Sequence, residues 1–275
     1  MDWARAKNLS ITAFIILNIL IGFLNYLDSR RYILGADSIA AITSVLETRE
    51  IKIDRNFEFI SNEPLRQISF ESQNINRNFL VGVLMQNNTN MSVQEDEEFT
   101  RFFNEAEEVV FGGQTNVRYR NISNFDLYFS SLQEARIFAA DMIVRLGDIG
   151  RYFVLDRSYS YDDTMVLMYR DMYRNNTIYS NALIFVFREG RIETIDFNYD
   201  RVIGFSGNPR EIRRADEVML TFARHVESDV VVREMDIVYK NINNIGTPHY
   251  RIIYERDGQF SSVLINAYTN IITNG

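Results

Sequence analysis

The feature that most constrains this chain is an uncharged, apolar run near its N-terminus, from Leu9 to Leu27. As a helix this run would be about 28 Å long, at about 1.5 Å per residue. The hydrocarbon core of a bilayer is about 30 Å thick, so a helix of that length can cross it. We therefore predict a transmembrane helix over residues 9–28, preceded by a short N-terminal segment, residues 1–8.

A cleavable signal peptide is the main alternative interpretation of the run. The apolar region of a signal peptide is usually about 7–15 residues long and is followed by a small-residue cleavage site. Here the run is longer, and the sequence that follows it, NYLDSRR at residues 25–31, is a poor place for cleavage. We expect an uncleaved signal anchor.

Basic residues flank the run on both sides and leave its orientation open. Arg5 and Lys7 precede it, and Arg30 and Arg31 follow it. The positive-inside rule compares the lysines and arginines near the two ends of a helix, and here the two ends tie.

Three residues inside the run, Asn18, Gly22 and Asn25, are spaced by four and three positions. This spacing places them on one face of a helix. Helices in lipid associate through small residues, which allow close approach, and through amides, which hydrogen-bond between helices. We call this set the transmembrane stripe and predict that it contacts a helix of a partner. The alternative is that the bilayer tolerates the Asn18 amide and that Asn25 reaches the headgroups.

The composition of the remaining chain excludes several classes of function. The chain has 275 residues, a formal net charge of −8, no cysteine and two histidines. The absence of basic runs argues against nucleic-acid binding, and the scarcity of cysteine and histidine argues against a structural zinc site. We identify no catalytic, cofactor-binding or metal-binding residues, and we expect that the chain is not an enzyme.

Hydrophobic periodicity predicts an α+β fold, in which the anchor precedes repeated units of one helix and an antiparallel sheet. The predicted helices cover residues 36–48, 92–111, 131–146 and 210–225. The predicted strands cover residues 51–54, 65–71, 79–86, 117–128, 151–159, 164–173, 178–188, 191–205, 230–241, 249–256 and 259–269.

Local signals make two parts of this prediction sharper. Ser131 or Ser130 caps the helix over 131–146, with Glu134 placed for a capping box. The dipeptides at residues 189–190 and 257–258, Glu-Gly and Asp-Gly, predict hairpin turns. We expect a membrane-proximal α+β domain over residues 32–129, and a membrane-distal domain over residues 130–275 with two helix–sheet units.

The two ends of the chain resemble the YycI family. The matching segments are MDW at residues 1–3, Arg5 and Lys7, FIILN at residues 14–18 and INAYTNI at residues 265–271. Asn270 stands where relatives are expected to have glycine, and asparagine is the next-best residue for a left-handed turn.

The resemblance implies a regulator of the WalK–WalR (YycG–YycF) two-component system of Gram-positive bacteria. The N-terminus would be cytoplasmic and the folded part extracytoplasmic. The partners would be the sensor histidine kinase and a YycH-like protein, with no nucleic acid, no cofactor and no catalysis. Two other classes stay open from the residues alone: a tethered ligand-binding or peptidase-inhibitor-like module, and an enzyme of the cell envelope.

Overall fold

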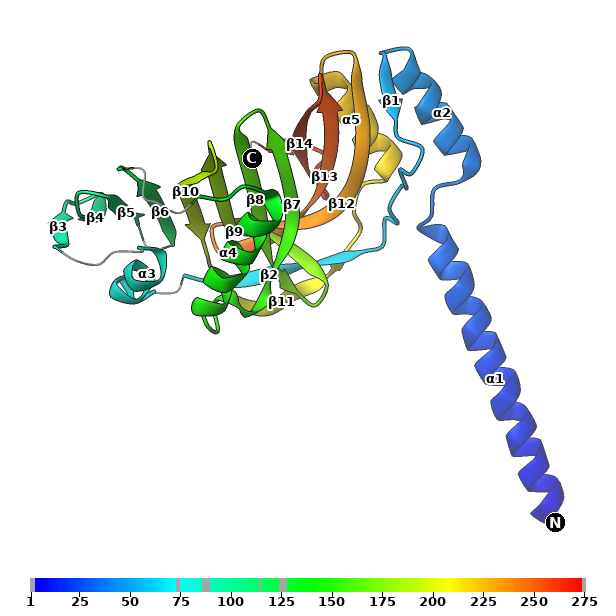
Figure 1. The fold of residues 1–275 in the computed structure, drawn as a ribbon. Coiled ribbons are helices and arrows are strands. Elements are labelled where there is room, and N and C mark those ends of the chain that lie inside the picture. Colours follow the sequence, from blue (N-terminus) through cyan, green and yellow to red (C-terminus); the bar gives the residue numbers. More distant parts are fainter. Residues whose placement is uncertain (1–2, 73–74, 86–89, 114, 124–127, 274–275) are drawn as a thin grey trace. The chain divides into compact units, whose positions relative to one another are not determined.

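The computed structural model describes residues 3–72, 75–85, 90–113, 115–123 and 128–273 (Figure 1). These residues form an α+β fold in which one N-terminal apolar helix precedes a part dominated by β-strands. The chain forms two compact units, each built from discontinuous segments. The first unit contains residues 1–65, 209–236 and 250–275, and the second contains residues 66–208 and 237–249. The domain boundary predicted at residues 129–130 therefore lies within the second unit.

Helix α1, Trp3–Arg31, covers the whole apolar run. Its segment Lys7–Leu24 is long and apolar enough to cross a membrane, and none of this segment is buried against the rest of the described chain. The predicted helix is confirmed.

The rest of the first unit packs two helices against short strand segments. Its elements are α2 (Ala36–Glu47), β1 (Ile51–Ile53), α5 (Ala215–His225), the start of β12 (Val230–Ile242), the end of β13 (Ile245–Arg256), β14 (Gln259–Asn266) and β15 (Ile272–Thr273). Strand β1 runs parallel to β12, and α5 lies against α2 and β14 (Figure 1). Leu46 on α2 and Phe222 on α5 are fully buried.

The second unit is built around a long antiparallel arrangement of strands. Its strands are β2 (Leu65–Glu71), β3 (Ser92–Glu95), β4 (Phe99–Phe103), β5 (Glu107–Gly112), β6 (Asn116–Asn121), β7 (Phe153–Tyr161), β8 (Thr164–Tyr173), β9 (Asn176–Arg188), β10 (Arg191–Asn198) and β11 (Arg201–Arg210). Neighbours in the order β7-β8-β9-β10-β6-β5-β4-β3 pair antiparallel. Strand β12 adds a parallel pairing to β9, with Val238 opposite Thr177.

Two helices of the second unit, α3 (Arg77–Leu84) and α4 (Leu132–Arg145), supply side chains to its main hydrophobic core. Ala135 and Met142 of α4 belong to the same buried cluster as Phe185 and Phe187 of β9. The predicted start of α4 is confirmed, because the Ser131 hydroxyl accepts a hydrogen bond from the Glu134 backbone N–H at 3.3 Å. The Glu134 carboxylate accepts in turn from the Ser130 backbone N–H at 2.7 Å, so the helix start is doubly capped.

The predicted hairpin turns are also confirmed. Glu189 and Gly190 have φ values of 50° and 73°, and Asp257 and Gly258 have φ values of 51° and 76°. Two consecutive left-handed residues are what a two-residue hairpin loop of the primed type needs. Asn270 has a φ of 58° and makes the left-handed turn expected of it.

The strand predicted at residues 79–86 is wrong, because the described part of this segment belongs to helix α3. The Asn76 side chain caps the helix by accepting from the Phe79 backbone N–H at 3.2 Å. The helix buries Leu80, Val81 and Leu84 in the core of the second unit. A short, continuous apolar run fits a buried strand or a buried helix equally well by periodicity, and here tertiary packing selects the helix.

The helix predicted at residues 92–111 is also wrong, because this segment forms strands β3, β4 and β5. Thr100 and Phe102 on β4, and Val109 and Phe111 on β5, are buried at every second position. Glu95, at the end of β3, and the acidic residues 96–98, in the connection to β4, are exposed. Cross-strand pairing of β4 with β5 and of β5 with β6 outweighs the local helical signal.

Two further boundaries differ from the prediction. The helix predicted from residue 210 begins at Ala215, because strand β11 continues to Arg210. The strand predicted over residues 191–205 is two strands, β10 and β11, which are separated by Tyr199 and Asp200.

Candidate functional site

Two residues of the transmembrane stripe, Asn18 and Gly22, lie on α1 where no other part of the described chain covers them. The Asn18 side-chain amide donates to the Phe14 carbonyl oxygen at 2.8 Å, one turn earlier. A Cβ atom added to Gly22 would meet no atom within 4 Å. The backbone of Asn25 is helical, but its side chain lies outside the described residues. The role of the stripe in binding a partner stays a prediction.

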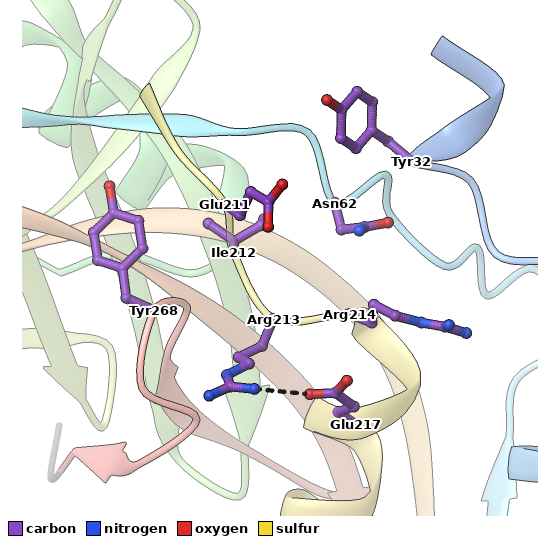
Figure 2. A pocket seen from close by; sticks show the side chains of 8 residues that line it. All are labelled: Tyr32, Asn62, Glu211, Ile212, Arg213, Arg214, Glu217 and Tyr268. Carbon is purple, nitrogen blue, oxygen red and sulfur yellow. Dashed lines mark ion pairs between the residues drawn. The ribbon is translucent and has the colours of Figure 1, made fainter. Parts of the chain in front are cut away.

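A polar pocket of about 430 Å³ lies in the first unit, and Tyr32, the residue that follows α1, is one of its walls. We call it the Tyr32 pocket (Figure 2). Asn62 is held beside Tyr32 because its backbone N–H donates to the Tyr32 carbonyl oxygen at 3.0 Å. The opposite walls come from the segment that leads into α5 and from the turn after β14. The remaining lining residues are Glu211, Ile212, Arg213, Arg214, Glu217 and Tyr268.

The two arginines of the Tyr32 pocket are paired with carboxylates near them in sequence. The Arg213 guanidinium lies 3.7 Å from the Glu217 carboxylate, as Figure 2 shows. Arg214 makes two hydrogen bonds to the Asp216 carboxylate, at 3.2 and 2.7 Å, and donates a third to the Ser38 hydroxyl at 3.1 Å. These contacts orient the guanidinium groups at the start of α5.

Tyr268 forms the far wall of the pocket and is fixed at both ends. Its hydroxyl donates to the Leu65 carbonyl oxygen at 2.9 Å, and the Arg210 guanidinium carbon lies 4.6 Å from its ring centroid. Burial raises the pKa of Tyr268 above its ordinary value. This tyrosine is therefore neutral at physiological pH and serves as a hydrogen-bonding and stacking surface.

The chemistry available in the Tyr32 pocket is that of polar contact. The raised pKa of Tyr268 lies further from neutrality than its ordinary value does. The described residues contain no group of three or more histidine, cysteine or acidic side chains that could hold a metal ion. Arg213 and Arg214 are adjacent in the sequence and could be noticed there as a basic pair. Tyr32, Asn62 and Tyr268 come from distant segments, so the sequence does not indicate that they share a pocket with this pair.

The two histidines occupy different environments. His225 lies in the last turn of α5, where a basic side chain complements the helix dipole. His249 is fully buried, and its Nδ1 lies 2.8 Å from the Thr247 carbonyl oxygen, which assigns the proton to Nδ1. Its Nε2 is buried without a hydrogen-bond partner in the described structure. Burial is the main cause of the lowered pKa of His249.

Comparison with known proteins gives no family assignment. No family model matches the chain, and no curated protein matches it. An uncharacterized protein from Eubacterium rectale superimposes with a TM-score of 0.49 at 12% identity, over 82% of this chain and 91% of that chain. The C-terminal domain of YpeB from Bacillus megaterium gives a TM-score of 0.41 at 12% identity, over 73% of this chain and 96% of that chain. Both scores lie below 0.5, so neither likeness carries an inference about this chain.

Proposed function

We propose that the chain is a membrane-anchored, non-catalytic regulator of a sensor histidine kinase that controls cell-wall homeostasis, of the kind found in the YycI family. The observation that carries the proposal is helix α1, whose segment Lys7–Leu24 is uncovered along its whole length. Leaving one leucine, isoleucine or phenylalanine side chain in water instead of burying it costs about 1.5–3 kcal/mol. A helix with this many exposed apolar side chains therefore needs a bilayer around it.

The α1 helix offers more than an anchor, because one of its faces is suited to contact another helix. Asn18 uses one N–H on its own helix, which leaves its second N–H and its carbonyl oxygen for a partner. Gly22, one turn further, leaves open space for a neighbouring backbone. An interhelical hydrogen bond in lipid contributes about 0.6–2 kcal/mol, enough to select a partner without locking the complex.

The proposed orientation has the N-terminus in the cytoplasm and the folded units outside the cell. The resemblance of the chain ends supports this orientation, since the flanking charges tie. Protease added to intact protoplasts should digest the chain after Tyr32. Digestion that occurs only after lysis would place the folded units inside.

The Tyr32 pocket supports a contact role for the first unit. Its arginines are held by neighbouring carboxylates and are not aimed at a reactive group. Catalytic acids and bases need pKa values near the operating pH, whereas burial moves the pKa of Tyr268 further above it. We propose that the pocket contributes to extracytoplasmic contacts with the kinase or with a YycH-like partner.

The two helix–sheet units predicted from the sequence also remain part of the proposal. Helix α4 is followed by the strands β7–β10, and α5 by the strands β12–β14. In both cases a helix is followed by strands, and this shared order supports the prediction that the two helix–sheet units are equivalent.

The transmembrane contact can be tested by changing the stripe. The variant with Asn18→Leu and Gly22→Leu should insert and express normally, because both changes favour the bilayer. The association constant for the kinase or for the YycH-like partner, measured by crosslinking in native membranes, should fall about 3- to 30-fold. This decrease corresponds to about 0.6–2 kcal/mol. Expression of the genes that the kinase controls should shift with it.

The matched control carries leucines at Thr12 and Ile19, which lie off the stripe face. This control should crosslink and signal like the wild type. Equal behaviour of the stripe variant and the wild type would mean that the asparagine is tolerated and that partner contact lies in the folded units.

A further inference from the structure

A second cavity, of about 560 Å³, lies in the second unit and shares no lining residue with the Tyr32 pocket or the transmembrane stripe. We call it the tyrosine pocket. Its chemistry comes from one acid, two arginines and three tyrosines: Asp171, Arg174, Arg201, Tyr152, Tyr173 and Tyr199. They come from the end of β8, the turn after it, the 3₁₀ turn before β7, the segment between β10 and β11, and the first residue of β11. The volume falls in the range of about 300–1,000 Å³ that is usual for small-ligand sites.

The acid of this pocket is buried and fixed in place. Asp171 is 4% exposed, and its Oδ2 accepts from the Asn181 side-chain amide at 2.9 Å. Asn181 is itself fully buried, and it also donates to the Asp200 carbonyl oxygen at 2.7 Å and accepts from the Asp200 backbone N–H at 2.9 Å. The β8–β9 register shifts between Arg170 and Asp171. Such irregularities often re-aim a side chain beside a binding site.

Asp171 has no cationic partner in the part of the chain that the structure describes. Its interactions are with Asn181, with the Met172 backbone and with the field of Tyr199. Burial raises its pKa, because a buried carboxylate without a cation loses hydration and gains little in return. A positive charge placed in the pocket would supply the missing partner.

The aromatic walls are suited to hold such a cation. Phe197 stacks on Tyr199 with ring centroids 6.3 Å apart, and Phe153 contacts the same ring at 6.3 Å. Phe205 fixes Tyr173 in an edge-on contact at 5.5 Å. The guanidinium carbons of Arg174 and Arg151 lie 5.5 and 5.6 Å from the ring centroids of Tyr173 and Tyr152, so these two rings already have a cation of the chain beside them. Tyr199 is the ring of the pocket that is left to attract an ammonium group through its quadrupole.

The two arginines offer the opposite charge at the rim of the pocket. Arg174 and Arg201 are exposed, and neither has a carboxylate partner among the described residues. The pKa of Tyr199 is raised mainly by burial and further by Asp171, while Arg201 lowers it. Asp171, Arg201 and Tyr199 all line this pocket, so it holds groups of both charges. Guanidinium groups bind carboxylates through two parallel hydrogen bonds.

We propose that the tyrosine pocket binds a small zwitterion, an α-amino acid or a short peptide. Its ammonium group lies against Asp171 and the Tyr199 ring, and its carboxylate lies against Arg174 and Arg201. This site does not depend on the regulatory role proposed for the anchor.

The test uses the full chain in detergent micelles and ligand-observed NMR. One pool contains the twenty standard L-amino acids, and a second contains the twenty L-alanyl dipeptides. We expect at least one member of one pool to bind, and the pool it comes from distinguishes the free amino acid from the peptide. Its N-acetyl form, which lacks the cation, and its amide form, which lacks the carboxylate, should each bind at least tenfold more weakly. Absence of binding from both pools, or equal binding of the capped forms, overturns the proposal.

Variants then assign the binding to this pocket. Asp171→Asn keeps the shape of the side chain and should reduce affinity at least tenfold. Arg201→Gln changes an exposed residue, so the fold is retained, and it should weaken binding of the wild-type ligand but not of its amide form. The matched control is Arg188→Gln, an exposed arginine at the end of β9 that pairs with Glu193 outside the pocket. An equal loss of affinity in Arg188→Gln and Arg201→Gln would overturn the assignment, because it would reflect net charge alone.

Discussion

Two hairpin turns of the chain have the same backbone geometry and different surroundings, which makes them a matched pair for mutation. Gly190 and Gly258 have φ values of 73° and 76°. A Cβ atom added to Gly258 would meet nothing within 4 Å. One added to Gly190 would lie 2.4 Å from a ring carbon of Tyr128 and 2.9 Å from the Phe129 carbonyl oxygen. Gly190→Ala should therefore destabilise the chain more than Gly258→Ala does.

The magnitude follows from two separate costs. An L-residue in the left-handed region costs about 1–2 kcal/mol, and alanine recovers about 0.4–1 kcal/mol by restricting the unfolded chain. The net loss for Gly258→Ala is thus about 1 kcal/mol. Gly190→Ala adds an overpacking cost of about 1–3 kcal/mol, because the Phe129 carbonyl is backbone and accepts no large displacement. The two variants should differ by about 1–3 kcal/mol.

Differential scanning calorimetry of the full chain in detergent micelles measures this difference. For about 150–250 residues, 1 kcal/mol corresponds to about 2–4 °C in Tm. Gly258→Ala should lower Tm by about 2–4 °C, and Gly190→Ala by about 2–12 °C more. Asparagine tolerates the left-handed region, so Gly258→Asn should be nearly neutral while Gly190→Asn should remain destabilising.

A double-mutant cycle separates the two contacts at Gly190. In a Tyr128→Ala background the ring contact is gone, so Gly190→Ala should cost less than in the wild type. Gly190 lies in the second unit and Gly258 in the first, so each substitution is measured on the unfolding transition of its own unit. An equal loss of unfolding free energy for Gly190→Ala and Gly258→Ala would refute the reasoning. That result would mean that the segment containing Tyr128 moves aside freely.

Three further predictions concern the described core and capping residues. The lowered pKa of His249 means that the unfolded state binds its proton more tightly than the folded state does. The free energy of unfolding should therefore rise with pH up to about 6.5 and level off above it. In His249→Leu, unfolding measured over the same pH range should lack this rise. Tyr119→Phe removes a buried hydrogen bond to the Glu107 carboxylate at 2.8 Å and should cost about 1.5–3 kcal/mol in urea unfolding, and an unchanged midpoint would contradict it. Ser131→Ala removes the cap that accepts from Glu134 and should cost about 1 kcal/mol, whereas Ser131→Asp should retain most of the stability.

The elements that could be predicted from the sequence are those whose cause is local. The apolar run specifies α1 because length and hydropathy alone decide whether a helix can cross a bilayer. Ser131 and Glu134 specify the start of α4 because the capping contacts form within four residues. The Glu189-Gly190 and Asp257-Gly258 dipeptides specify their turns because few residues adopt two consecutive left-handed conformations.

The segments that failed are those whose conformation depends on strand pairing and core packing, which the spacing of their apolar residues does not show. Residues 92–111 carry phenylalanines at a spacing that suits a helix, but β5 pairs with β6, and β6 pairs with β10, more than 70 residues further on. Residues 79–84 suit a buried strand, but the Asn76 cap and the core of the second unit hold them as a helix. Burial against a distant surface contributes more than local propensity, so the tertiary structure decides these cases.

The pockets also follow from tertiary structure. Asp171 looks in the sequence like one polar residue in an alternating strand, and Tyr152, Tyr199 and Arg201 lie 19 to 30 residues away from it. Only the pairing of β8 with β9 and the turn into β11 bring these groups around one cavity. The transmembrane stripe is the opposite case: helical spacing alone defines its face, because Lys7–Leu24 of α1 is not buried against any other described segment. The sequence by itself therefore determined the apolar helix, the spacing of its polar residues and the local turns, whereas long-range strand pairing decided which distant side chains share a pocket.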